Sequence, residues 1–259
     1  MRGDVLTQLR NFFKLIYLSR KFNFYLRKFS MFTHKIQFLL EWRMSENPEY
    51  FDHQIDLNYR WFKTRYSYPL ERGVFSSFAL ESRMNQQNHT LDLCCGDGFY
   101  AYYFYSIKST KVTAVDFDAK VIEYAKSLYG NAQNIDFYIL DIRNGLPLGK
   151  FDNIIWDAAI EHFTEKEINK IMSEIKKSLK PDGILSGYTI VEPKQGGKHL
   201  HQHEYEFHDK KDLARFLEPF FKKVQVFSTT YPDRENLYFY ATNGLLPFET
   251  TGNLIVDLS

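Results

Sequence analysis

The chain has 259 residues, of which 33 are Lys or Arg and 32 are Asp or Glu, so its formal net charge is +1. This length suits one α/β domain with an added segment, and it buries a core without disulfides or structural metals. The near-neutral total argues against a protein that coats nucleic acid by charge alone. Its two cysteines, Cys94 and Cys95, are too few for a disulfide framework and too close for an ordinary bridge. We therefore expect a reducing, cytoplasmic location.

The positive charge is concentrated at the N-terminus. Residues 1–45 hold nine Lys/Arg and two Asp/Glu, so the rest of the chain carries a net charge of −6. Apolar residues such as Val5, Leu9 and Phe12 recur there at helical spacing. A basic, aromatic helix of this kind can lie on an anionic membrane surface, or it can dock on its own domain. We call residues 1–45 the basic leader, expect it to be helical or poorly ordered, and consider peripheral membrane contact as one role.

The next segment, residues 46–90, is rich in aromatic and polar side chains and is interrupted by Pro48 and Pro69. Helices and turns are expected here, and we predict that they cover the active site of a catalytic domain formed by residues 91–259.

From residue 90 onwards, short β-rich runs alternate with helical runs. The strand-like runs are Thr90–Leu93, Lys111–Asp116, Asp136–Leu140, Phe151–Trp156, Ile184–Ile190, Val224–Phe227 and Leu237–Ala241. Asp118, Thr164 and Asp209 each precede a helical pattern and are suited to cap it, and Lys180–Gly183 predicts a turn. This order predicts an α/β fold with a doubly wound, mostly parallel, seven-stranded sheet and an N-terminal helical extension.

Ligands of such sheets bind beyond the carboxyl ends of the strands. The strongest motif follows the first strand, where Gly96 and Gly98 allow a tight turn and close approach of the backbone to a ligand. Asp116 lies 20 residues after Gly96 and can accept hydrogen bonds from ribose hydroxyls. The spacing Gly96-x-Gly98-x-x-Ala101 also fits a dinucleotide fingerprint, which keeps a dehydrogenase among the alternatives.

Asp92 distinguishes between these nucleotide ligands. A buried acid four residues before Gly96 is unfavourable beside a pyrophosphate, whereas it suits a cofactor that carries an ammonium and a sulfonium. With this acid, the segment resembles the first motif of the class I S-adenosylmethionine (SAM)-dependent methyltransferases, although Cys94 stands in the first Gly position. The resemblance covers most of residues 50–245 and extends through Ala114–Asp118, Asp141–Ile142, Phe151–Asp157 and Leu179–Gly183.

The sequence is most similar to a bacterial group of these enzymes without an assigned substrate, which shares Glu49–His53 and Glu71–Phe75. The resemblance implies SAM as cofactor, and it implies the following roles. Asp92 would lie near the methionine amino group, and Cys94, Gly96 and Gly98 would line the cofactor. Asp116 would hold the ribose hydroxyls, Phe117, Asp141 and Ile142 would contact the adenine, and Asp157 would stand where cofactor and acceptor meet. From its charge and placement alone, Arg72 is a further candidate, for the methionine carboxylate.

The acceptor side has two candidate segments. Glu161 and His162 follow the fourth strand, and four of the eight histidines lie within residues 199–208. If residues 199–203 are extended, His199, His201 and His203 share one face. We consider Glu161, His162 and His203 as catalytic residues, with His162 or His203 accepting a proton from the acceptor.

Two other interpretations of these residues remain open. Glu161 and His162 with a distant histidine such as His203 resemble the divalent-metal sites of methyltransferases that modify the 3′ end of small RNAs or act in ubiquinone synthesis. In those enzymes a second Glu completes the pattern, whereas this chain has Asp157 or Ala158 there, so a metal is not favoured. Alternatively, Glu161 and His162 cap a helix and the loop histidines are solvated.

These observations predict an enzyme that moves the SAM methyl group to an oxygen or nitrogen atom of a small-molecule or sugar-like acceptor. One alternative is a metal-assisted RNA 2′-O-methyltransferase, which the net charge of −6 outside the basic leader disfavours. Another is a nucleotide-binding module without methyl transfer.

Overall fold

The computed structural model describes residues 2–44, 52–63, 66–81, 86–193, 198 and 200–247. The chain divides into two compact units, Met1–Ser67 and Tyr68–Ser259.

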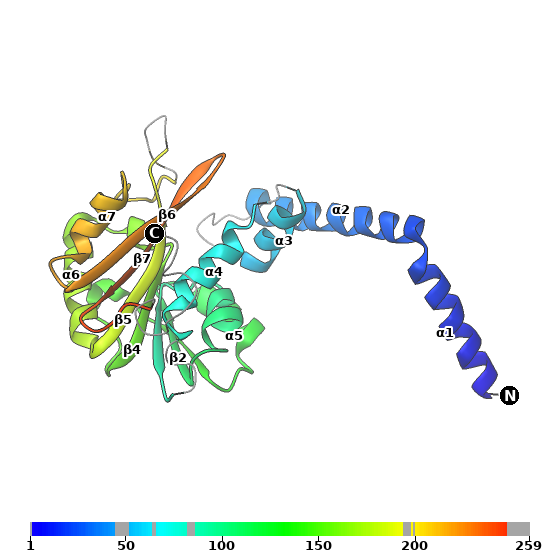
Figure 1. Cartoon of the computed structure of the whole chain (residues 1–259), viewed down its shortest axis with the longest axis horizontal. Helices are drawn as coiled ribbons and strands as arrows, with labels where there is room; N and C mark the ends of the chain where they lie inside the picture. The colour runs from blue at the N-terminus through cyan, green and yellow to red at the C-terminus, as the bar shows by residue number, and fades with distance from the viewer. Residues whose placement is uncertain are drawn as a thin grey trace. The chain divides into compact units, whose positions relative to one another are not determined.

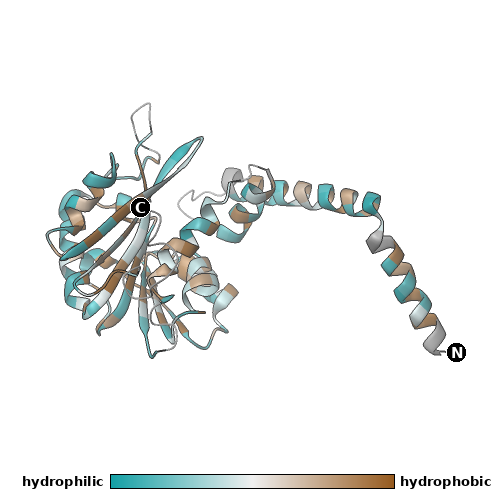
Figure 2. Cartoon of the chain, in the orientation of Figure 1, coloured by the Kyte–Doolittle hydropathy of each residue, from teal (hydrophilic) through white to brown (hydrophobic). Residues whose placement is uncertain are grey.

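The first unit contains helices α1 (Arg2–Leu18), α2 (Arg20–Met44) and α3 (His53–Lys63). The rings of Phe38 and Tyr59 stack with centroids 3.9 Å apart and join α2 to α3. Hydrophobic and hydrophilic residues alternate along α1 and α2 (Figure 2), and many of their large apolar side chains are exposed. None of the described helices is long and apolar enough to span a bilayer.

The second unit is built on a seven-stranded sheet in the order β3-β2-β1-β4-β5-β7-β6. Its strands are β1 (His89–Leu93), β2 (Lys111–Asp116), β3 (Ile135–Ile139), β4 (Phe151–Asp157), β5 (Leu179–Ile190), β6 (Lys223–Tyr231) and β7 (Arg234–Thr242). All neighbours pair in parallel except β7, which is antiparallel to both β5 and β6. The predicted doubly wound sheet is therefore confirmed, and its strand order reverses between β1 and β4.

Helices cover both faces of the sheet. They are α4 (Tyr68–Phe78), α5 (Ala119–Tyr129), α6 (Glu165–Ser178) and α7 (Lys210–Leu217), with short helical turns η2 (Ala101–Tyr105), η3 (Ile142–Asn144) and η4 (Ile160–His162). Figure 1 shows α4 and α5 on one side of the sheet and α6 and α7 on the other. Strands buried in this way on both faces read as apolar runs, and β4 is buried along its whole length.

The three predicted caps are confirmed. The Asp118 carboxylate accepts from the amide of Lys120, and the Asp209 carboxylate accepts from two amides in the first turn of α7. Thr164 and Glu167 form a reciprocal capping box at the start of α6.

The turn predicted at Lys180–Gly183 is wrong, because these residues lie within β5. The register passes from Phe151 opposite Leu179 to Asn153 opposite Ile184, so four residues of β5 bulge beside a single residue of β4. The last two strands are also longer than predicted. They pair along their whole length as a hairpin, and half-buried β6 does not have the continuous apolar pattern that marks the other strands.

Candidate active site

A strained turn follows β1 at the carboxyl edge of the sheet. Cys94, Gly96 and Gly98 have φ values of 58°, 54° and 77°, a left-handed conformation that glycine adopts readily and cysteine rarely. A Cβ at Gly98 would also lie 2.7 Å from the Phe137 ring. The turn therefore brings the backbone at Gly98 close to the Phe137 ring on β3.

Asp92 is a buried carboxyl within β1, with 3% of its surface exposed. Its Oδ2 has no hydrogen-bond partner among the described residues. Burial raises the pKa of Asp92 well above its ordinary value, and the carboxylates of Asp157 and Asp116 raise it further. A buried oxygen without a partner costs free energy, and a bound cationic group would supply the missing donor. This geometry fits the ammonium of SAM.

Asp116, at the end of β2, is fixed beside the same turn. Its Oδ2 accepts from the Gly96 amide at 3.1 Å and its Oδ1 accepts from the Asp118 amide at 3.0 Å. Burial raises the pKa of Asp116, and these two amides oppose part of that rise. Phe117, which follows, is 57% exposed and presents an apolar ring at the same edge.

Asp141 follows β3 and caps η3. It accepts hydrogen bonds from the amide and from Nε of Arg143, and the Arg143 side chain lowers its pKa. Ile142 is buried beside it.

The acidic side chains of several strand ends surround Cys94. Burial raises the pKa of the Cys94 thiol, and the carboxylates of Asp116, Asp92, Asp141 and Glu161 raise it further, in that order. The structure therefore brings together residues from the ends of β1, β2, β3 and β4, as the predicted topology requires.

Asp157, at the end of β4, forms a buried ion pair with Arg72 of α4. Arg72 Nη2 lies 2.6 Å from Asp157 Oδ2, and the Ser76 hydroxyl donates to Oδ1 at 2.8 Å. The guanidinium also lies over the rings of Tyr100 and Tyr188. Although burial disfavours its charge, the pKa of Arg72 is raised, because Asp157 stabilises the cation.

Sequence reasoning had named Arg72 and Asp157 separately and had missed their pairing. It had also missed Ser76, Tyr100 and Tyr188. These side chains lie far apart in the sequence, and no motif signals their contact.

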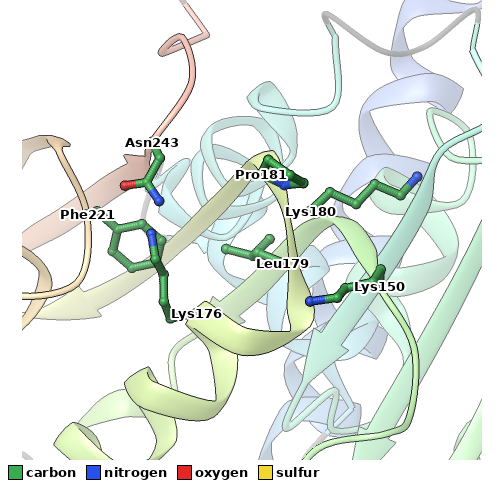
Figure 3. Close-up of a pocket in the computed structure, with 8 residues that line it drawn as sticks. Lys150, Lys176, Leu179, Lys180, Pro181, Phe221 and Asn243 are labelled. Carbon is green, nitrogen blue, oxygen red and sulfur yellow. The ribbon is translucent and has the colours of Figure 1, made fainter.

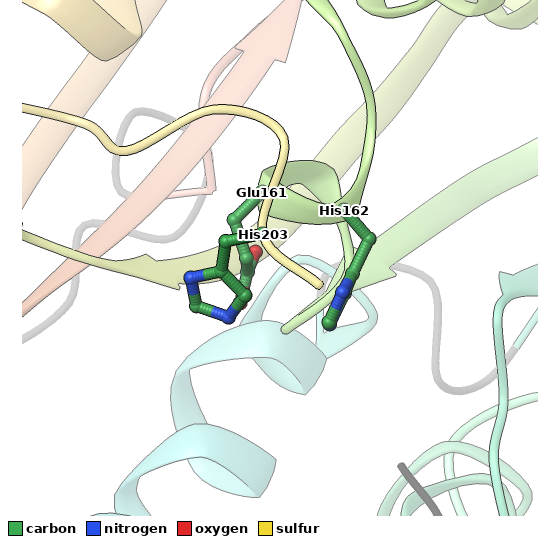
Figure 4. A group of neighbouring side chains, drawn as sticks. All are labelled: Glu161, His162 and His203. Carbon is green, nitrogen blue, oxygen red and sulfur yellow. The ribbon is translucent and has the colours of Figure 1, made fainter. Parts of the chain in front are cut away.

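Glu161, His162 and His203 form a compact group next to this edge. Their ligand atoms all lie within 4.8 Å of one another, and the two imidazole rings are perpendicular with centroids 4.9 Å apart. Figure 4 shows the Glu161 side chain beside the His203 ring, with His162 across from them. The structure thus brings together the three residues that we consider catalytic, although His203 lies on a distant loop.

Neighbouring groups hold this cluster in place. Thr189 donates to Glu161 Oε2 at 3.0 Å, and His203 Nδ1 lies 2.8 Å from Glu206 Oε1. The Glu161 carbonyl accepts from the amides of Glu204 and Tyr205, which fixes the histidine loop on η4. Sequence reasoning had missed Thr189 and Glu206, although a carboxylate three residues after His203 is a visible signal.

The loop is not extended at residues 201 and 202, so His201 and His203 do not share one face. Residues 201 and 202 form a turn, in which His201 is exposed while His203 is buried, because a turn does not alternate its side chains as a strand does. His199 lies outside the described residues. His208 is exposed and pairs with Glu192 at 2.9 Å.

A separate pocket lies at the opposite ends of the strands from this site, near the amino end of β5 (Figure 3). Its lining includes Lys150, Lys176 and Lys180. Lys180 already pairs with Asp152, and parallel strands place the ligand site at their other ends.

Comparison with known proteins gives a consistent result. Residues 90–183 match a family model described as a methyltransferase domain. The chain is 34% identical over 104 residues to an uncharacterized methyltransferase of Mycobacterium tuberculosis, covering 40% of this chain and 51% of that protein. It is 30% identical over 101 residues to a malonyl-[acyl-carrier protein] O-methyltransferase of Acetivibrio thermocellus, covering 39% of this chain and 35% of the relative. The matched region thus spans from about a third to about half of these curated relatives.

Solved structures share the fold at low identity. A complex of DhpI with S-adenosylhomocysteine (SAH) has a TM-score of 0.52 at 17% identity, covering 71% of this chain and 92% of that chain. The N-methyltransferase NodS from Bradyrhizobium japonicum in complex with SAH has a TM-score of 0.53 at 14% identity, covering 68% and 87%. These likenesses establish the fold.

Proposed function

We propose that this chain, which belongs to the class I SAM-dependent methyltransferases, transfers a methyl group from SAM to an oxygen or nitrogen atom of a small-molecule or sugar-like acceptor. The observation that carries this proposal is the buried carboxyl of Asp92 in β1, the strand that leads into the turn at Gly96 and Gly98; its Oδ2 has no hydrogen-bond partner among the described residues.

The electrostatics of the edge favour SAM over a dinucleotide. SAM supplies an activated methyl group on a sulfonium and carries a second positive charge on its amino group. Asp157 is already paired with Arg72, but the carboxyls of Asp92 and Asp116 would repel a pyrophosphate, whereas they stabilise cationic groups.

The other cofactor contacts in the proposal follow from position. Cys94, Gly96 and Gly98 line the cofactor, Asp116 accepts from the ribose hydroxyls, and Asp157 marks the boundary with the acceptor. Phe117 supplies an exposed ring for the adenine, and Asp141 with the Ile142 amide lies at its edge. This arrangement is supported by their shared place at the ends of β1 to β4.

Glu161, His162 and His203 face the acceptor in this proposal. Because Asp157 ends β4 and η4 follows three residues later, the cluster lies next to the cofactor contacts. Methyl transfer depends mainly on alignment of the two reactants, and a hydroxyl acceptor also benefits from a base that takes its proton.

Calorimetry with SAM and with NAD tests the cofactor assignment. We expect SAM to bind with one site per chain and NAD not to bind; tight NAD binding without SAM binding would overturn the proposal. Incubation of the enzyme with labelled SAM in a cell extract, followed by identification of the labelled product, then tests the acceptor class.

We further propose that the basic leader contacts anionic lipid surfaces. Exposed aromatic side chains on α1 and α2, such as Phe13 and Phe29, accompany the excess of Lys and Arg in residues 1–45. This combination binds the interface of membranes that carry negative lipids.

A further inference from the structure

We propose that Glu161, His162 and His203 bind one divalent first-row transition-metal ion and that its open coordination positions take an oxygen atom of the acceptor. Metal binding concerns this chain's own residues alone. Binding of the acceptor oxygen to the metal rests on the proposed methyltransferase function.

The spacing of the three side chains suits a shared ion. Metal bonds to imidazole nitrogen and carboxylate oxygen are about 2.0–2.2 Å long, so two ligand atoms of one ion lie within roughly 4 Å of each other. In this cluster, which is the candidate metal group among the described residues, all ligand atoms lie within 4.8 Å. Small side-chain rotations would close the remaining distance.

The contacts around the cluster resemble those of built metal sites. A metal-binding histidine almost always has a carboxylate or carbonyl on its other ring nitrogen, which sets its orientation and its tautomer. Glu206 occupies that position, 2.8 Å from His203 Nδ1. A metal-binding carboxylate is in turn hydrogen-bonded, as Glu161 is by the Thr189 hydroxyl at 3.0 Å.

The three side chains differ in how deeply they are buried, which leaves one side of the site open. Glu161 and His203 are 4% and 2% exposed, whereas His162 is half-buried. The carbonyl of Glu161 accepts from the amides of Glu204 and Tyr205, so the loop and η4 hold their ligands at fixed positions. An ion here would be anchored from the protein interior and reachable from the side of His162.

The ligand set indicates the class of metal. Two imidazoles and one carboxylate suit Zn²⁺, Mn²⁺, Fe²⁺ or Co²⁺, whereas Mg²⁺ and Ca²⁺ prefer oxygen ligands alone. Three protein ligands leave positions for water or substrate, as in catalytic rather than structural metal sites. Because η4 begins three residues after the end of β4 at Asp157, those positions belong to the acceptor side of the proposed active site.

The test is metal binding by the full chain, purified with a chelator and then dialysed against Co²⁺ or Mn²⁺. We expect one ion per chain by elemental analysis and, for Co²⁺, visible absorption bands from nitrogen ligation. His162→Ala and His203→Ala should each weaken binding at least 10-fold. The matched control is His201→Ala, which removes an exposed imidazole two residues from His203 and should bind as the parent does.

Two outcomes would overturn the inference: no stoichiometric binding by the parent chain, or undiminished binding by His162→Ala. Because His162 is half-buried, its truncation is not expected to unfold the chain, and circular dichroism of each variant checks this. Calorimetry with SAM separates this test from the proposed function. SAM binding without metal binding refutes only the metal site, whereas metal binding without SAM binding refutes only the proposed function.

Discussion

The guanidinium of Arg72 and the carboxylate of Asp157 form a buried ion pair, with Nη2 2.6 Å from Oδ2, which ties helix α4 to the end of β4. The pair lies near Asp92, whose Oδ2 has no hydrogen-bond partner among the described residues, and the positive charge of Arg72 lowers the pKa of Asp92 against the stronger effect of burial. The Arg72 cation therefore pairs with Asp157 and also stabilises the charged form of Asp92.

Removing one partner of this pair should destabilise the fold. We expect Arg72→Met to lower the free energy of unfolding by about 3–5 kcal/mol, because it leaves Asp157 buried without a counter-charge. The double variant Arg72→Met/Asp157→Asn should recover at least about 2 kcal/mol of that loss. Urea unfolding of the single and double variants measures the coupling. Arg143→Met, which breaks the more exposed pair with Asp141, should cost less than about 1 kcal/mol; equal losses in both single variants would refute the argument.

Asp92→Asn should raise the stability of the chain and weaken its affinity for the cofactor. The pKa of Asp92 in the folded chain lies well above its ordinary value of 3.8. The contribution of the protonated Asp92 carboxyl to stability is therefore fully present below about pH 3.8, and it is lost as the pH rises through the pKa that Asp92 has in the folded chain. The variant cannot ionise, so its stability relative to the parent should increase with pH above this point, as urea unfolding at several pH values would show.

The same substitution should weaken SAM binding about 10- to 100-fold, because a charged hydrogen bond to the amino group is lost. Calorimetry measures this, with Asp136→Asn on β3 as a control for a carboxyl away from the site. A variant that is less stable at every pH, with SAM affinity unchanged, would contradict both expectations.

Gly98→Ala should damage the turn for two reasons. Its φ of 77° strains any side chain, and its Cβ would lie 2.7 Å from the Phe137 ring. We expect a loss of about 2–4 kcal/mol in the free energy of unfolding, measured by thermal or urea unfolding. Gly145→Ala places a Cβ at a φ of 133° with no neighbour within 4 Å and should show the strain alone. Adding Phe137→Leu to Gly98→Ala should restore part of the lost free energy of unfolding. If it does not, the clash with Phe137 is not the source of the loss.

The basic leader can be tested with lipid vesicles. We expect the chain to sediment with vesicles that contain phosphatidylserine and to remain unbound with neutral vesicles. Replacing Arg20, Lys21, Arg27 and Lys28 by Gln should weaken binding at least 100-fold at low salt, at about 1 kcal/mol per residue. The control carries the same change at four exposed lysines of α5 and α7: Lys120, Lys126, Lys210 and Lys211. Equal loss in both variants would show that the effect is one of net charge, not of the leader.

Much of the fold could be predicted because its signals are local. Strands covered on both faces require continuous apolar runs, and caps such as Thr164 require a polar residue at one position. The carboxyl edge could also be predicted, since parallel topology places the residues after β1, β2, β3 and β4 together. The bulge in β5 could not be predicted, because residues such as Pro181 and Gly183 are typical both of turns and of bulges.

The details of the site depend on contacts between distant parts of the chain. Ser76 and Asp157 are 81 residues apart, and Thr189 and Glu161 are 28 apart. No spacing rule connects such pairs, because loops and helices of variable length separate them. Sequence therefore identified the residue types at the edge, whereas only the folded chain shows which carboxyl is neutralised and which is left without a partner.

The two adjacent cysteines have a consequence for handling and for oxidative stress. Burial raises the pKa of both thiols well above its ordinary value, and the surrounding carboxylates raise it further. The thiolate is the form that reacts with alkylating agents and peroxide, so it is scarce at neutral pH. The thiols of Cys94 and Cys95, at the left-handed turn after β1, should therefore react slowly with these reagents at neutral pH.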